Sequence, residues 1–199
     1  MFVGRTPRKK HWTPFPAVFA LLLFTAAFSF PQDTASGVLD LDGRSADPFR
    51  SAGSKIVVLL FLRTDCPISN RYAPTIQELS VRYAGHVAFY LIYPIKSESS
   101  DQIRKHLLDF GYHVPALRDP GLKLARASQV SITPEAAVFS PARKLLYHGR
   151  IDDWYVEFTR ARRAPTTHDL ADSIEAAVSG KPLSAASIPA VGCYIPGLP

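Results

Sequence analysis

Two cysteines, Cys66 and Cys193, are the side chains of this 199-residue chain whose type and setting point most directly to chemistry. Cys66 follows an apolar run at 55–62 (KIVVLLFL) within four residues, and Pro67 comes directly after it. Proline suits the first turn of a helix, because the N–H that it lacks would have no partner there. The spacing therefore predicts a strand, a short loop and then a helix that begins at the cysteine.

The predicted setting of Cys66 favours a thiolate, because unpaired N–H groups and the dipole at a helix N-terminus stabilise negative charge. Ser69, one turn on, is placed to donate a hydroxyl hydrogen bond to the same sulfur. Arg63 would favour ionisation of the thiol further, whereas Asp65 would oppose it. We therefore predict that Cys66 is a nucleophile; the alternatives are an inert core cysteine or one half of a structural disulfide.

Cys193 lies in the tail 181–199, whose four prolines predict an extended chain over the surface and exclude a helix. At about 3.3 Å per extended residue, the tail is long enough to cross one face of a small domain. One hypothesis is that Cys193 resolves an oxidised Cys66 by forming a disulfide with it. The other is that a permanent Cys66–Cys193 bridge clamps the fold. The number of cysteines fits both hypotheses.

The elements that must position these residues follow from the apolar pattern. Uninterrupted aliphatic runs predict strands that are covered on both faces, and apolar residues at helical spacing predict helices. We expect strands at 55–62, 86–93, 135–140 and 144–151, helices at 69–83, 99–110 and 167–179, and shorter elements at 38–43, 114–117 and 121–128. This order predicts an α/β fold, with a central mixed β-sheet flanked by helices on both faces.

The segment 61–74 (FLRTDCPISNRYAP) resembles the active-site region of the redoxin family, the thioredoxin-like domains grouped with alkyl hydroperoxide reductase and thiol-specific antioxidant proteins. Ser69 stands at the second-cysteine position of the CxxC motif. Pro74, eight residues after Cys66, stands where thioredoxin-like proteins have a kinking proline. Thr133-Pro134, with Pro134 68 residues after Cys66, stands where the family has its cis-proline loop.

The resemblance spans residues 36–180 and implies a thioredoxin-like fold. It also implies that Pro134 is cis and that Thr133 and Pro134 shape a substrate groove beside a nucleophilic Cys66. The implied activity is thiol chemistry on a disulfide-bearing protein partner or a small peroxide, with no cofactor and no metal.

Two departures from the family leave the function open. Ser69 excludes dithiol exchange within the motif, and it removes one cysteine ligand of the copper sites found in related metallochaperones. Thr64 lies two residues before Cys66, whereas the peroxiredoxin pattern places a threonine three before. Disulfide and peroxide substrates both stay open. The alternative from another class is a non-catalytic thioredoxin-like binding module with a structural Cys66–Cys193 disulfide.

Residues 1–29 predict a secretory signal peptide, because four basic residues precede an uncharged apolar stretch that ends in small residues at Ala27 and Ser29. That stretch is short for a membrane span, which needs about 20 residues. We therefore expect an exported protein of the periplasm or cell envelope, and the alternative is an uncleaved N-terminal anchor. The expected organisation is a signal at 1–29, the thioredoxin-like domain at 36–180 and the Pro-rich tail at 181–199.

The charge of the chain gives no reason to expect a nucleic-acid partner. The whole chain carries 23 basic and 17 acidic residues, but four of the basic residues lie in the expected signal. The remainder has 19 basic and 17 acidic residues, which is too even a balance for an electrostatic nucleic-acid surface. Apolar residues make up 47% of the chain, enough to build a buried core.

Overall fold

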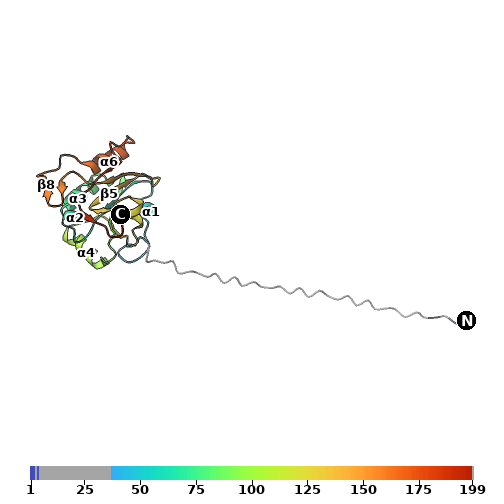
Figure 1. The fold of residues 1–199 in the computed structure, drawn as a ribbon. Helices are drawn as coiled ribbons and strands as arrows, with labels where there is room; N and C mark the ends of the chain where they lie inside the picture. Colours follow the sequence, from blue (N-terminus) through green and yellow to red (C-terminus); the bar gives the residue numbers. More distant parts are fainter. Residues whose placement is uncertain (3, 5–36, 199) are drawn as a thin grey trace. The chain divides into compact units, whose positions relative to one another are not determined.

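The structure is a computed structural model that describes residues 1–2, 4 and 37–198, shown in Figure 1. Nearly all of the expected signal peptide lies outside the described residues. Within the described part of the chain, no helix has both the length and the apolar character that crossing a membrane requires.

A six-stranded mixed sheet forms the centre of the domain, with strands in the order β3-β2-β1-β5-β6-β9. β1 pairs in parallel with β2 and antiparallel with β5, which confirms the predicted mixed sheet. Every residue of β1 and β5 is buried, and this explains why β1 is a continuous apolar run and why β5 is apolar from Ala136 onward, without alternation. The strands are β1 Ile56–Phe61, β2 Val87–Tyr93, β3 Ala116–Arg118, β5 Glu135–Phe139, β6 Leu145–Gly149 and β9 Ser187–Ile188.

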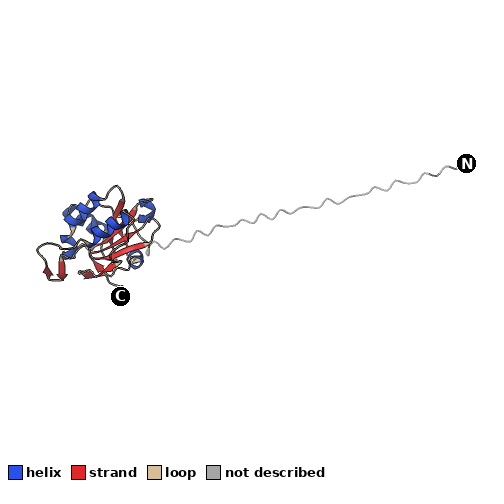
Figure 2. Ribbon diagram, turned by 90° about the horizontal axis from the view of Figure 1, so that it is seen from above, coloured by secondary structure: helices blue, strands red, loops and turns tan. Residues whose placement is uncertain are grey.

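Helices cover both faces of this sheet, as predicted (Figure 2). One buried cluster joins the sheet to α3, α4 and α6 through Ile76, Ile103 and Ile174. A second cluster on the other face joins the sheet to α1 and α5 through Ala52 and Leu124. The helices are α1 Pro48–Ala52, α2 Pro67–Arg71, α3 Ala73–Arg82, α4 Ser100–Asp109, α5 Lys123–Ala127 and α6 Asp169–Val178.

The single helix predicted at 69–83 is in fact two helices, α2 and α3, which meet at Tyr72. Pro74 lies in the first turn of α3, where its missing N–H leaves no bond back into α2 and so separates the two helices. The short element expected at 38–43 is not a strand of the sheet, because Leu39 forms only isolated bridges, with Ser45 and Arg118.

The tail runs back over the domain in extended form. Its β9 adds a sixth strand beside β6, and its β10 (Cys193–Tyr194) pairs antiparallel with β4 (Ile132–Thr133). Only a glycine at 149 allows β9 to approach, because a Cβ there would lie 2.1 Å from the Ile188 carbonyl oxygen. A separate hairpin, β7 (Tyr155–Glu157) with β8 (Arg160–Ala161), stands at the rim of the domain in both views (Figures 1 and 2).

Candidate active site

Cys66 lies at the N-terminus of α2, directly after the loop that follows β1. It is the N-cap residue, with extended backbone angles, and its carbonyl oxygen accepts a 3.1 Å hydrogen bond from Asn70 N–H. Its side chain is 0% exposed. The predicted order of strand, loop and helix start is therefore what the structure shows, but the sulfur is covered.

Cys193 is the residue that covers this sulfur. The antiparallel pairing of β10 with β4 places Cys193 opposite Thr133, and its Sγ lies 2.6 Å from that of Cys66. Neither cysteine is in a disulfide in this structure, and Cys193 is half-buried. Two thiols that are 127 positions apart in the sequence are thus brought together by the tail.

The loop around Thr133 and Pro134 contacts both cysteines. The Thr133–Pro134 peptide bond is cis, as the family resemblance implied. The Thr133 carbonyl oxygen lies 3.3 Å from Cys66 Sγ, and its hydroxyl donates a 3.3 Å hydrogen bond to the Cys193 carbonyl oxygen. The structure therefore brings the cis-proline loop, Cys66 and the tail to one place.

Ser69 completes the set of site residues expected from the sequence. Its side chain is fully buried, and among the described residues no other group meets the distance and angle criteria of a hydrogen bond to its hydroxyl. The hydroxyl and the N–H of Ser69 nevertheless lie close enough to Cys66 to favour its thiolate. All five predicted site residues, Cys66, Ser69, Thr133, Pro134 and Cys193, are thus gathered at the start of α2.

The two thiols differ in acidity. Burial raises the pKa of Cys66, but the hydrogen bond from Cys193 and the donors of Ser69 and Ile68 outweigh it and bring the pKa below the usual value. The pKa of Cys193 is raised to about 12 by burial and by the adjacent Cys66. The first negative charge of the reduced pair therefore resides on Cys66, and the Cys193 thiol donates to it.

The charged side chains near the site interact mostly with each other or with an aromatic ring. Arg63 forms two hydrogen bonds to the Asp65 carboxylate, each 2.9 Å long, so the opposing effects expected from these two side chains are joined in one ion pair. The guanidinium of Arg71 lies 5.0 Å from the ring centroid of Trp154 and is engaged in packing. Hydrogen bonds from the Cys193 thiol and from the donors of Ser69 and Ile68, more than formal charges, therefore lower the pKa of Cys66.

Comparison with known proteins identifies the fold. No protein-family model matches the sequence, and no curated protein is significantly similar to it. An uncharacterized conserved protein from Geobacillus kaustophilus has a similar structure, with a TM-score of 0.69 and 22% identity over 80% of this chain and 86% of that one. A thioredoxin-like protein from Aeropyrum pernix matches with a TM-score of 0.52 and 15% identity, over 73% of this chain and 89% of the other.

A third similar structure is a thiol:disulfide interchange protein of the thioredoxin family from Chlorobium tepidum TLS. It matches with a TM-score of 0.52 and 14% identity, over 70% of this chain and 90% of that chain. The fold is thioredoxin-like. The narrower resemblance to the redoxin family stays a prediction.

One buried carboxylate beside the loop that precedes Cys66 was not predicted from the sequence. Glu98, in the loop between β2 and α4, accepts hydrogen bonds from the N–H and the hydroxyl of Thr64, each 2.7 Å long. Its other oxygen is buried and has no partner in the part of the chain that is described, and burial raises the pKa of Glu98. In the sequence Glu98 stands in a polar stretch before a helix cap, where an acid is normally solvated, so no local pattern marks it.

A hydrogen-bonded chain also fixes the loop before Cys66. Asn70 donates to the Thr64 carbonyl oxygen at 3.2 Å and accepts from Nε2 of His106 at 2.8 Å. Nδ1 of His106 then accepts from the Tyr93 hydroxyl at 2.8 Å. Burial lowers the pKa of His106, which keeps the ring neutral. This network ties α4 and β2 to the loop and holds the cysteine in position.

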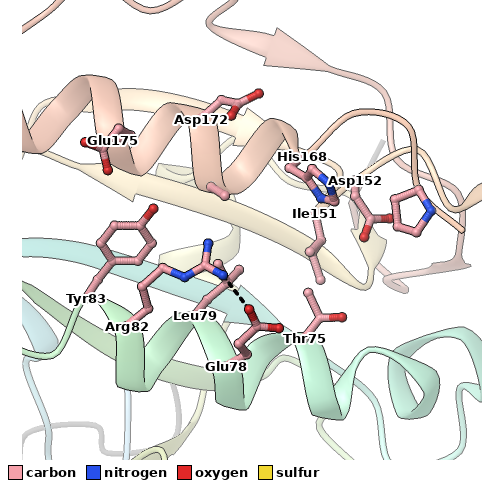
Figure 3. Close-up of a pocket in the computed structure, with 12 residues that line it drawn as sticks. Thr75, Glu78, Leu79, Arg82, Tyr83, Ile151, Asp152, His168, Asp172 and Glu175 are labelled. Carbon is pink, nitrogen blue, oxygen red and sulfur yellow. Dashed lines mark hydrogen bonds and ion pairs between the residues drawn. The ribbon is translucent and has the colours of Figure 1, made fainter.

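Two cavities differ in their relation to the cysteines. The one shown in Figure 3, of about 480 Å³, lies between α3 and α6. Its Glu78 is paired with Arg82, and its Asp152 accepts a 2.6 Å hydrogen bond from Tyr72, so these polar groups serve local structure. The other, an open hollow of about 600 Å³, is lined by Cys193 and its neighbours in the tail. Cys193, but not Cys66, therefore lines the second hollow.

Metal ligands of the usual kinds do not gather at the site. Within residues 37–198, no group of three or more His, Cys, Asp or Glu side chains is placed to hold a metal ion. The two adjacent sulfurs thus lack a third ligand of this kind from the described residues.

Proposed function

We propose that this protein is a thiol:disulfide oxidoreductase whose redox pair is Cys66 and Cys193. The observation that carries the proposal is the placement of the two sulfurs 2.6 Å apart against the Thr133–Pro134 loop. Oxidation of the pair forms one S–S bond and transfers two electrons and two protons to a partner disulfide, which becomes a dithiol. The reverse reaction oxidises a partner dithiol.

The residues of the site have distinct roles in this exchange. Cys66 is the thiolate of the reduced pair, and it is the nucleophile that attacks the Cys193 sulfur when Cys193 is joined to a partner. The Ser69 hydroxyl, which has no other partner in the described chain, stabilises the negative charge on Cys66. Thr133 holds the tail by the hydrogen bond from its hydroxyl to the Cys193 carbonyl oxygen, and its own carbonyl oxygen lies 3.3 Å from Cys66 Sγ.

Protein disulfides are the partners that the fold supports best, since one neighbour of the same fold is by its name a thiol:disulfide interchange protein. We further propose that the protein acts outside the cytoplasm, because a signal peptide at 1–29 and a chain with two cysteines suit an oxidising compartment. We propose no nucleic-acid partner for this protein.

Titration of the purified protein against glutathione redox buffers tests this function. The expected result is reversible loss and gain of two hydrogens in the intact mass, with peptide mapping that places the bridge between Cys66 and Cys193. The Cys66→Ser and Cys193→Ser variants serve as controls that cannot form it.

Two other outcomes would replace the proposal. A bridge that forms once and resists mild thiols would mean a structural disulfide and a non-catalytic binding module. Oxidation of Cys66 by dilute peroxide at a rate far above that of an ordinary thiol would mean a peroxidase.

A further inference from the structure

The tail is anchored on both sides of Cys193. Before it, β9 pairs in parallel with β6 of the central sheet. After it, the Ile195 N–H donates a 2.9 Å hydrogen bond to the Ser131 carbonyl oxygen, and the Ile195 side chain is 2% exposed within the core. Cys193 is therefore held over Cys66 by a strap with two fixed ends, rather than by a free arm.

Because of this strap, the two cysteines differ in how accessible they are to a partner molecule. Cys66 is completely buried, whereas Cys193 is half-buried and lines the open hollow. Phe158 and Tyr194 border the same hollow and are 51% and 75% exposed. Apolar side chains held at the surface in this way offer a contact area for a polypeptide that approaches Cys193.

We propose that external thiols attack the oxidised pair at Cys193, and that Cys66 acts beneath it as the leaving sulfur. The inference rests on the proposed thiol:disulfide exchange and adds to it which atom the partner touches. A thiolate attacks a disulfide along the S–S axis, from the side opposite the leaving sulfur. Because Cys66 lies under the strap, only the far side of Cys193 offers that approach.

The reaction balances with an external dithiol as the reductant. The first thiolate of the dithiol attacks Cys193 Sγ, a new S–S bond forms to Cys193, and the Cys66–Cys193 bond breaks with its electron pair going to Cys66. The second thiol loses its proton to water and attacks the partner sulfur, so that the partner disulfide forms and Cys193 is released. Cys193 takes up one proton, and the dithiol has given two electrons to the pair.

The acidity of the two thiols agrees with this direction of attack. A sulfur of low pKa leaves more easily than one of high pKa. The pKa of Cys66 is lowered by donors that stay in place during the exchange, Ser69 and Ile68 among them. Cys66 is thus the better leaving group of the pair, and Cys193 is the better target.

Gly192 offers a way to lift the strap without touching either sulfur. A Cβ at this position would lie 2.1 Å from the Thr133 carbonyl oxygen, which is backbone and has little freedom to move. The Gly192→Ala substitution should therefore separate β10 from β4 and uncover Cys66.

The first experiment locates the mixed disulfide. The oxidised full-length protein is treated briefly with reduced glutathione, quenched with acid, alkylated in denaturant and digested with trypsin. Cys66 and Cys193 fall in separate peptides, 64–71 and 164–199, because the bond after Lys181 precedes a proline. We expect glutathione on the peptide of Cys193 and the alkyl group on that of Cys66.

The second experiment measures access to each thiol by native alkylation with N-ethylmaleimide. In Cys66→Ser, Cys193 should react within about tenfold of its rate in the denatured protein. In Cys193→Ser, Cys66 should react at least about 100-fold more slowly than when denatured, since the strap must first open. Adding Gly192→Ala to Cys193→Ser should raise the Cys66 rate about tenfold or more, with circular dichroism to show that the fold is kept.

The outcomes distinguish failure of the proposed site of attack from failure of the proposed thiol:disulfide exchange. Glutathione on peptide 64–71, or a Cys66 that reacts as fast as Cys193, would overturn this inference while leaving the redox function intact. A pair that exchanges with no thiol at all would overturn the proposed function, and this inference with it.

Discussion

The hydrogen bond from Cys193 to Cys66 makes the acidity of Cys66 depend on the tail. In Cys193→Ala the donor is lost, whereas in Cys193→Ser a hydroxyl remains to donate to the thiolate. A hydrogen bond to a charged group contributes about 1.5–3 kcal/mol, and one pKa unit corresponds to about 1.4 kcal/mol. Because Cys66 is fully buried, solvent does not screen the effect. The pKa of Cys66 should therefore be about 1–2 units higher in Cys193→Ala than in Cys193→Ser.

The assay is a pH titration of thiolate ultraviolet absorbance. Each variant retains one cysteine, so the signal belongs to Cys66 once the tyrosine background is subtracted. That background comes from a Cys66→Ser, Cys193→Ala double variant measured in parallel. Equal pKa values in the alanine and serine variants, or a lower value with alanine, would refute the idea that the tail stabilises the thiolate.

Three further substitutions test the surroundings of the site, each by urea unfolding. Burial raises the folded-state pKa of Glu98, so the free energy of unfolding should fall as the pH rises from the ordinary pKa of a glutamic acid through the raised one. Glu98→Gln should therefore gain stability relative to the parent protein over that pH range, and a difference independent of pH would contradict this. Gly149→Ala should lower the free energy of unfolding by about 1–3 kcal/mol, because its Cβ would overlap the backbone of β9. The control Gly85→Ala, with open space around it, should change the free energy of unfolding little. Tyr72→Phe should cost about 1–3 kcal/mol by leaving Asp152 without its 2.6 Å hydrogen bond, and an unchanged stability would show that the buried carboxylate finds another donor.

The central part of the fold was predictable because burial shapes the sequence directly. The runs at 55–62 and 86–93 are apolar after their first residues, Lys55 and His86, as expected of strands covered on both faces, and they form β1 and β2. The order of elements then implied a mixed sheet with helices on both faces, which the structure confirms. The break between α2 and α3 was missed because the apolar spacing continues across Tyr72 while Pro74 interrupts only the backbone bonding.

The surroundings of the cysteines were less predictable, because they depend on contacts between distant segments. Cys66 at a helix start is a local pattern, but its burial under the strap results from β9 and β10, each only two residues long. Gly149 and Gly192 permit these close approaches, and a single glycine in a sequence does not show which segment will approach it. Glu98 is likewise held at its buried position by Thr64, which lies 34 residues earlier in the sequence.

The proposed thiol:disulfide exchange depends above all on a reversible redox equilibrium of the Cys66–Cys193 pair. The full-length protein would be equilibrated with glutathione buffers of graded composition, quenched with acid and analysed by intact mass and peptide mapping. We predict one reversible two-electron transition, the same from the oxidised and the reduced side, with the bridge between Cys66 and Cys193 in every oxidised sample. A bridge that never opens under mild thiols, or two cysteines that never pair, would contradict it.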